Sequence, residues 1–377
     1  MKRMFPMILL FALLLCVPVR ADELTLDAPS ALLMEKQTGT VLFAKDEHTP
    51  REPASVTKVM TLLLTMDAID SGALSYDDTV TGSAHAASMG GSQIWLKEGE
   101  QMRVEDLIKA VCVVSGNDAA VALGEHLAGS EEAFVARMNE RAKELGMNDT
   151  HFVNCTGLPA DGHVTSAYDI ALMSRELIWR HPDIRRFTTI WMDSLRGGAS
   201  MLVNTNKLVR FYPGATGLKT GSTDSAKYCI SATAEKDGME LIAVILGGST
   251  SDKRFTDAKA LLNYGFAAYS LVTVTPESPL PAVPVTLGTQ KTVQSVLTSE
   301  NALLLEKSRA NGLTQAVSLP ESIDAPVEEG EPLGTLDIFD ANGTPVASLP
   351  LLAGESIPRL TWSELFCRLL KLAYCGA

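Results

Sequence analysis

Strand-like segments stand at both ends of a helix-rich region, and this order limits the folds open to the chain. Two short apolar runs, at 31–34 and 41–44, are joined by the turn-like stretch 36–39 and predict a β-hairpin. Apolar runs at 228–233 and 241–247 predict two further strands. We therefore predict a mixed α/β (α+β) domain whose sheet joins its first and last segments.

Apolar residues at helical spacing predict the helices that lie between these strands. In the stretch EPASVTKVMTLLL, Pro53 stands just ahead of an apolar face that recurs from Val56 to Leu63. The predicted helices are one that starts at Ser55, Val104–Val114, Ala119–Leu127 capped by Asp118, Ile170–Trp179 behind the capping box 166–169, and one around 257–264. The gap between the second and third helices leaves 115–117 in a loop.

A change in composition after Thr275 predicts a domain boundary. Ten of the 18 prolines fall in residues 276–377, and alternating apolar residues resume around Leu336. The pair Asn342-Gly343 is a strong hairpin-turn signal. We expect a first domain at 22–275 and a small all-β domain at 276–357.

The last segment, 358–377, has the pattern of an amphipathic helix. Its apolar residues gather on one side at helical spacing, while Glu364, Arg368 and Lys371 take the other. It is shorter than the roughly 20 residues that span a bilayer. It can dock on the β domain, pair with another helix or lie in a membrane interface, and its terminal position favours the interface.

The N-terminus has the pattern of a secretory signal peptide at 1–21. Lys2 and Arg3 precede the apolar run Met7–Val17, and the run ends near a small residue, Ala21, suited to cleavage. An uncleaved anchor is the competing reading, but the run is short for a membrane span. A lipid-modified Cys16 fits less well, because Leu15 occupies a position that favours a small residue.

Charge and cysteine content exclude several classes of partner and site. Removal of residues 1–21 takes three of the 32 basic residues and none of the 45 acidic ones, so the formal net charge falls from −13 to −16. Nucleic acids are therefore unsuitable partners. Five cysteines would remain, without close pairs, and neither a disulfide framework nor a zinc motif is indicated.

Three short motifs follow one another along the first domain: Ser55-Val-Thr-Lys58, Ser115-Gly-Asn117 and Lys219-Thr220-Gly221. Each is weak alone, since a helix cap or a turn explains it equally well. Their order and placement together are specific. Rival nucleophile systems are not indicated, because the chain has no Gly-x-Ser-x-Gly elbow and no histidine in a Ser/His/Asp setting.

These residue types suit nucleophilic catalysis. Ser55 and Lys58 share a helix face, so the lysine amine can take the serine proton once a neighbouring cation such as Lys219 lowers its pKa. Ser115 can pass the proton to a leaving amine, and Asn117 can hold a substrate amide. We expect the strand with Lys219 to run beside the helix.

Two further features of the third motif concern the substrate. Gly221 allows its strand to approach the substrate closely. The N–H groups of Ser55 and Ser222 can form an oxyanion hole.

The motifs and their surroundings resemble those of the serine penicillin-recognising enzymes, and in particular the D-alanyl-D-alanine carboxypeptidases among the low-molecular-mass penicillin-binding proteins. The segments that carry the resemblance are Glu52–Lys58, Ser115–Ala119, His151–Asn154 with Gly157-Leu158, and Gly217–Gly221. It spans roughly residues 25–270, and the β domain and tail are similar to that family's C-terminal half. The resemblance implies a serine β-lactamase/DD-peptidase-like fold.

The resemblance also implies an activity. An exported enzyme at the outer face of the cytoplasmic membrane would remove the terminal D-alanine from peptidoglycan stem pentapeptides through a Ser55 acyl-enzyme, without a metal or organic cofactor. Penicillins and other β-lactams would acylate Ser55. Many relatives have histidine after Lys-Thr-Gly where this chain has Ser222-Thr223, so Thr220, Ser222 and a nearby arginine are candidates for binding the substrate carboxylate. Cys155 is also atypical, and we expect it only to pack.

Three other functions stay open. A class A β-lactamase shares the motifs but needs a glutamate to activate the deacylating water, and between Asn148 and Tyr168 the only acids are Asp149 and Asp161. A DD-endopeptidase that cuts peptide crosslinks fits the same motifs. A catalytically inactive wall-binding protein is disfavoured, because every expected catalytic residue type is present.

Overall fold

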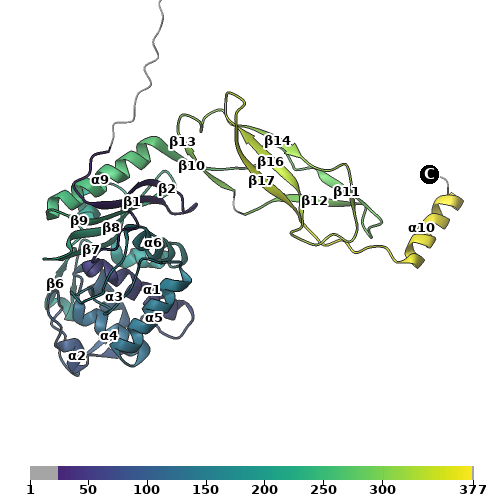
Figure 1. Cartoon of the computed structure of the whole chain (residues 1–377). Helices are drawn as coiled ribbons and strands as arrows, with labels where there is room; N and C mark the ends of the chain where they lie inside the picture. The colour runs from purple at the N-terminus through teal and green to yellow at the C-terminus, as the bar shows by residue number, and fades with distance from the viewer. Residues whose placement is uncertain (1–23, 300, 376–377) are drawn as a thin grey trace, which may run out of the picture.

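The computed structural model describes residues 24–299 and 301–375, and the predicted signal peptide at 1–21 lies outside them. Figure 1 shows a body of helices and strands formed by the N-terminal part of the chain, a narrower body of strands that follows it, and a helix at the C-terminal end. This is the predicted α/β domain with an all-β domain and a terminal helix. The exact domain limits stay a prediction.

One antiparallel sheet forms the centre of the N-terminal domain, in the order β2-β1-β9-β8-β7. Its strands are β1 (Ser30–Glu35), β2 (Val41–Lys45), β7 (Ala215–Thr223), β8 (Lys227–Lys236) and β9 (Met239–Gly248). The first strand pairs with the last, with Leu32 opposite Val244. The predicted hairpin and the predicted joining of the two ends are therefore confirmed.

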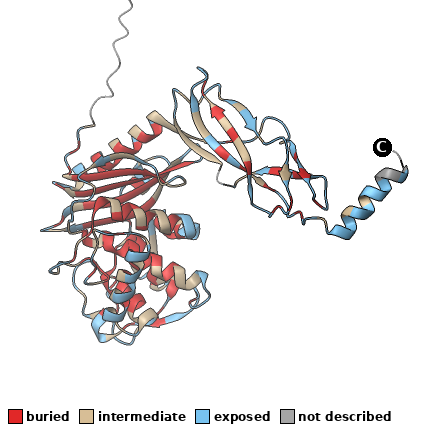
Figure 2. Cartoon of the chain, turned by 45° about the vertical axis from the view of Figure 1, so that its right-hand side comes forward, coloured by how far each residue is buried: buried red, intermediate tan, exposed pale blue. Residues whose placement is uncertain are grey.

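Helices cover both faces of this sheet. Successive residues of a strand point to opposite faces, and β1 accordingly places Leu32 in one core and Leu33 in the other. Helix α9 (Ser251–Ala268) packs on the Leu33 face. The other face carries α1 (Lys58–Asp70), α3 (Val104–Val113), α4 (Asn117–Ala128), α5 (Glu131–Glu144) and α6 (Ala167–Arg180). Figure 2 shows the resulting buried sheet and inner helix faces.

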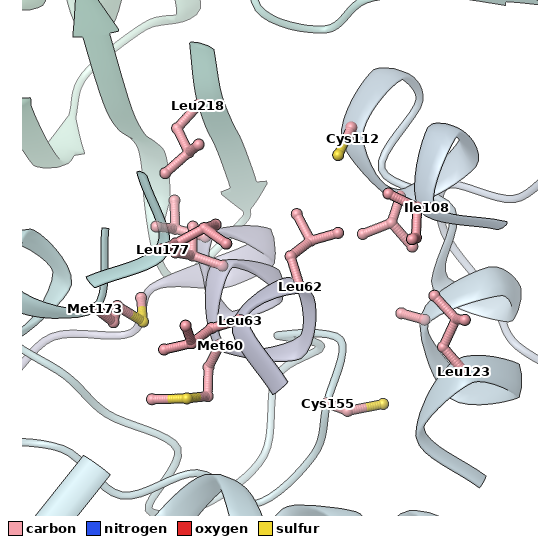
Figure 3. Packing of buried hydrophobic residues seen from close by; sticks show 14 of the residues in the cluster. Met60, Leu62, Leu63, Ile108, Cys112, Leu123, Cys155, Met173, Leu177 and Leu218 are labelled. Carbon is pink, nitrogen blue, oxygen red and sulfur yellow. The ribbon is translucent and has the colours of Figure 1, made fainter. Parts of the chain in front are cut away.

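The larger core surrounds α1. Leu62 and Leu63 of α1, Ile108 of α3 and Leu177 of α6 belong to one buried cluster, whose packing Figure 3 shows. Cys112, Cys155 and Cys229 are buried free thiols, as expected from their spacing. A close-packed core of this kind holds α1 rigidly, which matters because α1 begins directly after Ser55.

Short elements connect the main ones. They are η1 (Ala54–Thr57), β3 (Thr79–Thr81), α2 (Ala84–Ala87), β4 (Gln101–Arg103), η2 (Pro182–Ile184), α7 (Arg185–Thr188), β5 (Met192–Leu195), η3 (Arg196–Gly198), β6 (Ser200–Val203) and α8 (Leu208–Phe211). The pairs β3–β4 and β5–β6 are small antiparallel ribbons.

Two predicted helix starts are wrong. The helix predicted from Ser55 begins at Lys58, because Ala54 has a left-handed φ of 48° and the next residues form a tight 3₁₀ turn. Asp118 does not cap the third predicted helix, since Gly116 takes that position. The Asp118 carboxylate instead accepts hydrogen bonds from the backbone N–H groups of Ile94 and Leu96. Of the predicted capping box, the Ser166 cap is confirmed, because its Oγ accepts from the N–H of Asp169. The Asp169 carboxylate instead accepts from the Asp149 N–H and the Thr150 hydroxyl.

The C-terminal domain is built from strands, as predicted. Strand β10 (Tyr269–Thr273) follows α9 directly and pairs with β13 (Ala302–Glu306). The other strands form a six-stranded sheet in the order β14-β16-β17-β12-β11-β15. They are β11 (Ala282–Thr286), β12 (Thr292–Leu297), β14 (Thr314–Ser318), β15 (Ile323–Asp324), β16 (Pro332–Phe339) and β17 (Pro345–Ala353). Asn342-Gly343 turns the chain between β16 and β17, which pair antiparallel.

The terminal helix α10 (Trp362–Cys375) is present as predicted, at the C-terminal end of the chain (Figure 1). Trp362 is 87% exposed and Phe366 62% exposed. In the described ranges, no helix has both the length and the apolar character needed to cross a membrane.

Candidate active site

Strand β7 lies against the 3₁₀ turn that carries Ser55. A Cβ added to Gly221 would stand 2.8 Å from the Ser55 nitrogen and 2.8 Å from the Pro53 carbonyl oxygen. Only glycine permits this approach. The first and third motifs are thus side by side, and the predicted position of the Lys219 strand is confirmed.

Lys58 joins the first motif to the second. Its buried Nζ lies 2.9 Å from Ser55 Oγ, 2.6 Å from Asn117 Oδ1 and 2.7 Å from the Thr156 carbonyl oxygen. The last two atoms can only accept hydrogen bonds, so they take two N–H groups of the amine. A neutral amine then has its lone pair left for the Ser55 hydroxyl proton. The geometry fits a base that is set to receive this proton.

Burial also favours the neutral amine. Desolvation lowers the pKa of Lys58 well below its ordinary value, and the positive charge of Lys219 lowers it further. Lys219 is itself buried, and desolvation lowers its pKa to about 7. Its Nζ donates to the Thr220 carbonyl oxygen at 2.8 Å. Among the described residues, neither lysine amine forms an ion pair with a carboxylate. Strongly shifted pKa values of this kind are typical of functional sites.

Ser115 occupies the end of the α3–α4 connection in a strained conformation. Its φ is 65°, a left-handed value that is uncommon for a residue with a side chain. Its buried Oγ has no hydrogen-bond partner among the described residues. An unpaired buried hydroxyl costs about 1–3 kcal/mol, and sites that persist at this cost are frequently functional.

Asn117 is anchored more firmly than the sequence suggested. Besides accepting from Lys58, its side chain donates to the Gly90 carbonyl oxygen at 2.6 Å, and its backbone N–H donates to the Ser92 carbonyl oxygen at 2.7 Å. The loop between α2 and β4 therefore helps to hold Asn117 against Lys58. The expectation that Asn117 binds a substrate amide stays a prediction.

The candidate carboxylate-binding residues lie on and behind β7. Thr220 Oγ1 donates to Thr205 Oγ1 at 2.7 Å, while Ser222 is exposed. The nearby arginine is Arg254 of α9, whose Nη1 donates to the Gly221 carbonyl oxygen at 2.9 Å. Burial lowers the pKa of Arg254 to about 10. Its buried Nε has no partner among the residues that the structure describes.

Sequence reasoning missed several of these contacts. Thr156 contributes through its carbonyl, which every residue type has, and Thr205 and Arg254 stand in no local motif. Of four histidines that stand outside any catalytic motif, His163 is buried, whereas His85, His126 and His151 are exposed. Across the described ranges, no group of three or more His, Cys, Asp or Glu side chains is placed to hold a metal ion.

The fold and the Ser55–Lys58 pair have the arrangement that acyl transfer by a serine with a lysine base requires. The chain belongs to the D-alanyl-D-alanine carboxypeptidase family, whose model matches residues 18–250. Residues 272–359 match the model described as the C-terminal domain of penicillin-binding protein 5. The protein is thus a serine-type D-Ala-D-Ala carboxypeptidase with the family's all-β C-terminal domain.

Individual relatives agree over most of the chain. It is 41% identical to D-alanyl-D-alanine carboxypeptidase DacF of Bacillus subtilis (strain 168), covering 90% of this chain and 88% of that protein. Penicillin-binding protein 5 from Haemophilus influenzae superimposes with a TM-score of 0.79 at 27% identity, over 89% of this chain and 98% of the other. Penicillin-binding protein D2 from Listeria monocytogenes, solved in its ampicillin-bound form, matches at 34% identity with a TM-score of 0.59, over 64% and 99%.

Proposed function

We propose that Ser55 is the nucleophile that removes the terminal D-alanine from peptidoglycan stem pentapeptides, with Lys58 as its base. One observation carries this assignment: Lys58 Nζ lies 2.9 Å from Ser55 Oγ while two carbonyl oxygens bind its N–H groups. The family relationship supports a peptidoglycan substrate and binding of β-lactams.

The reaction has two steps. Lys58 takes the Ser55 proton, Oγ bonds to the carbonyl carbon of the penultimate residue, and the C–N bond to the terminal D-alanine breaks. The proton moves from Lys58 to the leaving amine, with the unpaired hydroxyl of Ser115 as the relay. Water then attacks the ester carbonyl carbon and loses a proton to Lys58. The bond between this carbon and Ser55 Oγ breaks, and Lys58 gives the proton to Oγ, which restores the free serine.

The backbone of β7 and the Ser55 turn supplies the stabilising groups. The N–H groups of Ser55 and Ser222 form the oxyanion hole, and one such donor is worth about 3–4 kcal/mol. Thr220 and Ser222 bind the terminal carboxylate, and the neighbouring Lys219 contributes a positive charge that attracts it. Arg254 adds positive charge from behind the strand, where it is held by the Gly221 carbonyl.

Mass spectrometry of the purified protein tests these assignments. We expect penicillin to add its mass to the peptide that contains Ser55, and a pentapeptide to lose one D-alanine. Ser55→Ala should abolish both reactions. Unchanged trimming by Ser55→Ala would contradict the proposal and favour a wall-binding role for this chain.

The same assay separates the enzymatic alternatives. Rapid hydrolysis of penicillin, instead of a long-lived adduct, would identify a class A-like β-lactamase. Preferential cleavage of a crosslinked peptide dimer over the pentapeptide would identify a DD-endopeptidase.

We propose further that the enzyme is exported and rests on the outer face of the cytoplasmic membrane through α10. Five exposed apolar side chains support this assignment: Trp362, Phe366, Leu369, Leu370 and Tyr374. Exposure of these side chains to water costs free energy, and their burial in a membrane interface removes this cost.

A further inference from the structure

A buried histidine lies beneath the Ser55 turn and has no role in the reaction described above. His163 is 2% exposed and its two ring nitrogens contact two different segments. Nε2 lies 2.8 Å from Thr57 Oγ1, and Nδ1 lies 3.0 Å from the backbone nitrogen of Val153. One ring thus connects the 3₁₀ turn to the loop after α5.

The hydrogen positions follow from the partners. Thr57 Oγ1 donates to the Ala54 carbonyl oxygen at 2.9 Å, so it must accept from His163 Nε2–H. The Val153 N–H can only donate, so His163 Nδ1 must accept. Only the neutral Nε2–H tautomer satisfies both bonds. Burial, with a smaller contribution from His151, lowers the pKa of His163 to about 4 and so favours this neutral form.

Thr57 in turn holds the residue next to the nucleophile. Ala54 adopts a left-handed φ of 48°, which costs an ordinary residue about 1 kcal/mol or more. The Ala54 carbonyl lies so close to Gly157 that a Cβ there would approach it to 1.8 Å. The hydrogen bond from Thr57 and the close contact with Gly157 therefore fix the direction in which the chain enters Ser55.

The loop on the other side of His163 holds the base. The Thr156 carbonyl accepts from Lys58 Nζ at 2.7 Å. Asn154 Oδ1 accepts from the N–H groups of Thr156 and Gly157, which stiffens the loop. Since His163 binds the start of this loop at Val153, it connects the surroundings of both Ser55 and Lys58.

We propose that His163 is a positioning residue for acylation: through Thr57 and the 153–157 loop, it keeps the Ser55 turn and the Lys58-binding carbonyl in register. The inference rests on the proposed function of Ser55 and Lys58. The ring nitrogens of His163 bind Thr57 and Val153, not Ser55 or Lys58, and the ring exchanges no proton with either. Its effect is on the relative placement of the nucleophile and its base.

Two matched pairs of variants test this role in the full chain. Thr57→Val removes the hydroxyl and Thr57→Ser retains it. His163→Asn keeps an acceptor near the position of Nδ1 but loses the donor to Thr57, whereas His163→Gln keeps a donor near the position of Nε2. The measured quantity is the first-order rate constant for acylation by a fluorescent penicillin at saturation, with the labelled fraction recorded separately.

We expect Thr57→Val to acylate at least about tenfold more slowly than Thr57→Ser, and His163→Asn more slowly than His163→Gln, because small misplacements of reacting groups cost large factors in rate. A purely structural role would reduce the labelled fraction and leave the rate constant of the folded molecules unchanged. Equal rate constants within either pair would overturn the inference. Failure of penicillin to label Ser55 in the unaltered chain would instead overturn the proposed function.

Discussion

The buried amine of Lys219 affects both the pKa of a neighbouring lysine and the stability of the fold. Its amine is buried between β7 and the end of α3, and burial lowers its pKa to about 7. The same charge lowers the pKa of Lys58. Burial removes the charged amine from water, and this desolvation lowers the free energy of unfolding. Active sites commonly carry such a loss of stability.

Lys219→Met should stabilise the protein at pH 7. The pKa of Lys219 is about 7 in the folded state and near 10.5 in the unfolded state. Between these pH values the unfolded state binds more protons than the folded state. The free energy of unfolding of the unaltered protein therefore rises with pH in this range. The slope reaches about 1.4 kcal/mol per pH unit for one proton. We expect the variant to gain about 2 kcal/mol or more at pH 7 and the gain to shrink toward pH 10.5.

Urea unfolding at several pH values measures this effect. Lys236→Met, the same change at an exposed position on β8, is the matched control. A stability difference for Lys219→Met that does not change with pH would contradict the electrostatic explanation.

Ser115 combines backbone strain with an unpaired hydroxyl. Ser115→Ala keeps the left-handed φ and removes the proposed proton relay. Protonation and release of the leaving amine should then slow, and kcat should fall by about 10²–10⁴-fold. Ser115→Gly removes the hydroxyl and also the steric strain. We expect both variants to lose activity alike, with the glycine variant the more stable of the two in thermal melts; a nearly normal kcat in either would remove Ser115 from the mechanism.

Among the elements, the contact between β7 and the 3₁₀ turn is the tightest part of the site. Gly221→Ala would place a methyl group 2.8 Å from both Ser55 N and Pro53 O, closer than such atoms approach. Either the strand or the turn must move. We expect penicillin acylation to slow by about 10²-fold or more, since a shift near 1 Å is sufficient for such a loss. Normal acylation with an unchanged melting temperature would show that the approach is not needed.

Asp118 connects α4 to the loop that holds Asn117. Its buried carboxylate accepts from the N–H groups of Ile94, Leu96 and Ala119. Asp118→Ala leaves these donors unpaired, and we expect a loss of about 2–4 kcal/mol in unfolding free energy. Asp118→Asn retains one acceptor oxygen and should lose less; equal losses in chemical denaturation would argue against the hydrogen bonds as the cause.

At the scale of the whole molecule, we expect α10, at the end of the β domain, to affect where the protein is located in the cell and not its catalytic activity. A chain that ends at Pro358 lacks the exposed apolar face and keeps every site residue described above. We expect it to leave the membrane fraction while keeping its kcat on a soluble pentapeptide. Trp362→Ser with Phe366→Ser should act in the same direction, whereas Ser363→Ala is the control; unchanged partition of the shortened chain would assign membrane binding to another segment.

The resemblance of three motifs led to the correct family, because their residue types and order are specific in combination. Alternating and helical periodicity also predicted the joined sheet, the all-β domain and the terminal helix. Periodicity did not predict where the helices begin at Lys58 and Asn117. Those positions depend on Ala54, whose carbonyl lies against the distant Gly157, and on the break in the helix at Gly116.

The amino-acid sequence by itself determined which side chains are present for chemistry and which faces of the elements are apolar, since both are local properties of the chain. Only the tertiary structure decided that Thr156 offers its carbonyl to Lys58, that Arg254 lies behind Gly221, and that His163 connects two segments. These contacts use backbone atoms and residues up to 106 positions apart. Such contacts have no local pattern, because they arise only when the packed core brings distant segments together.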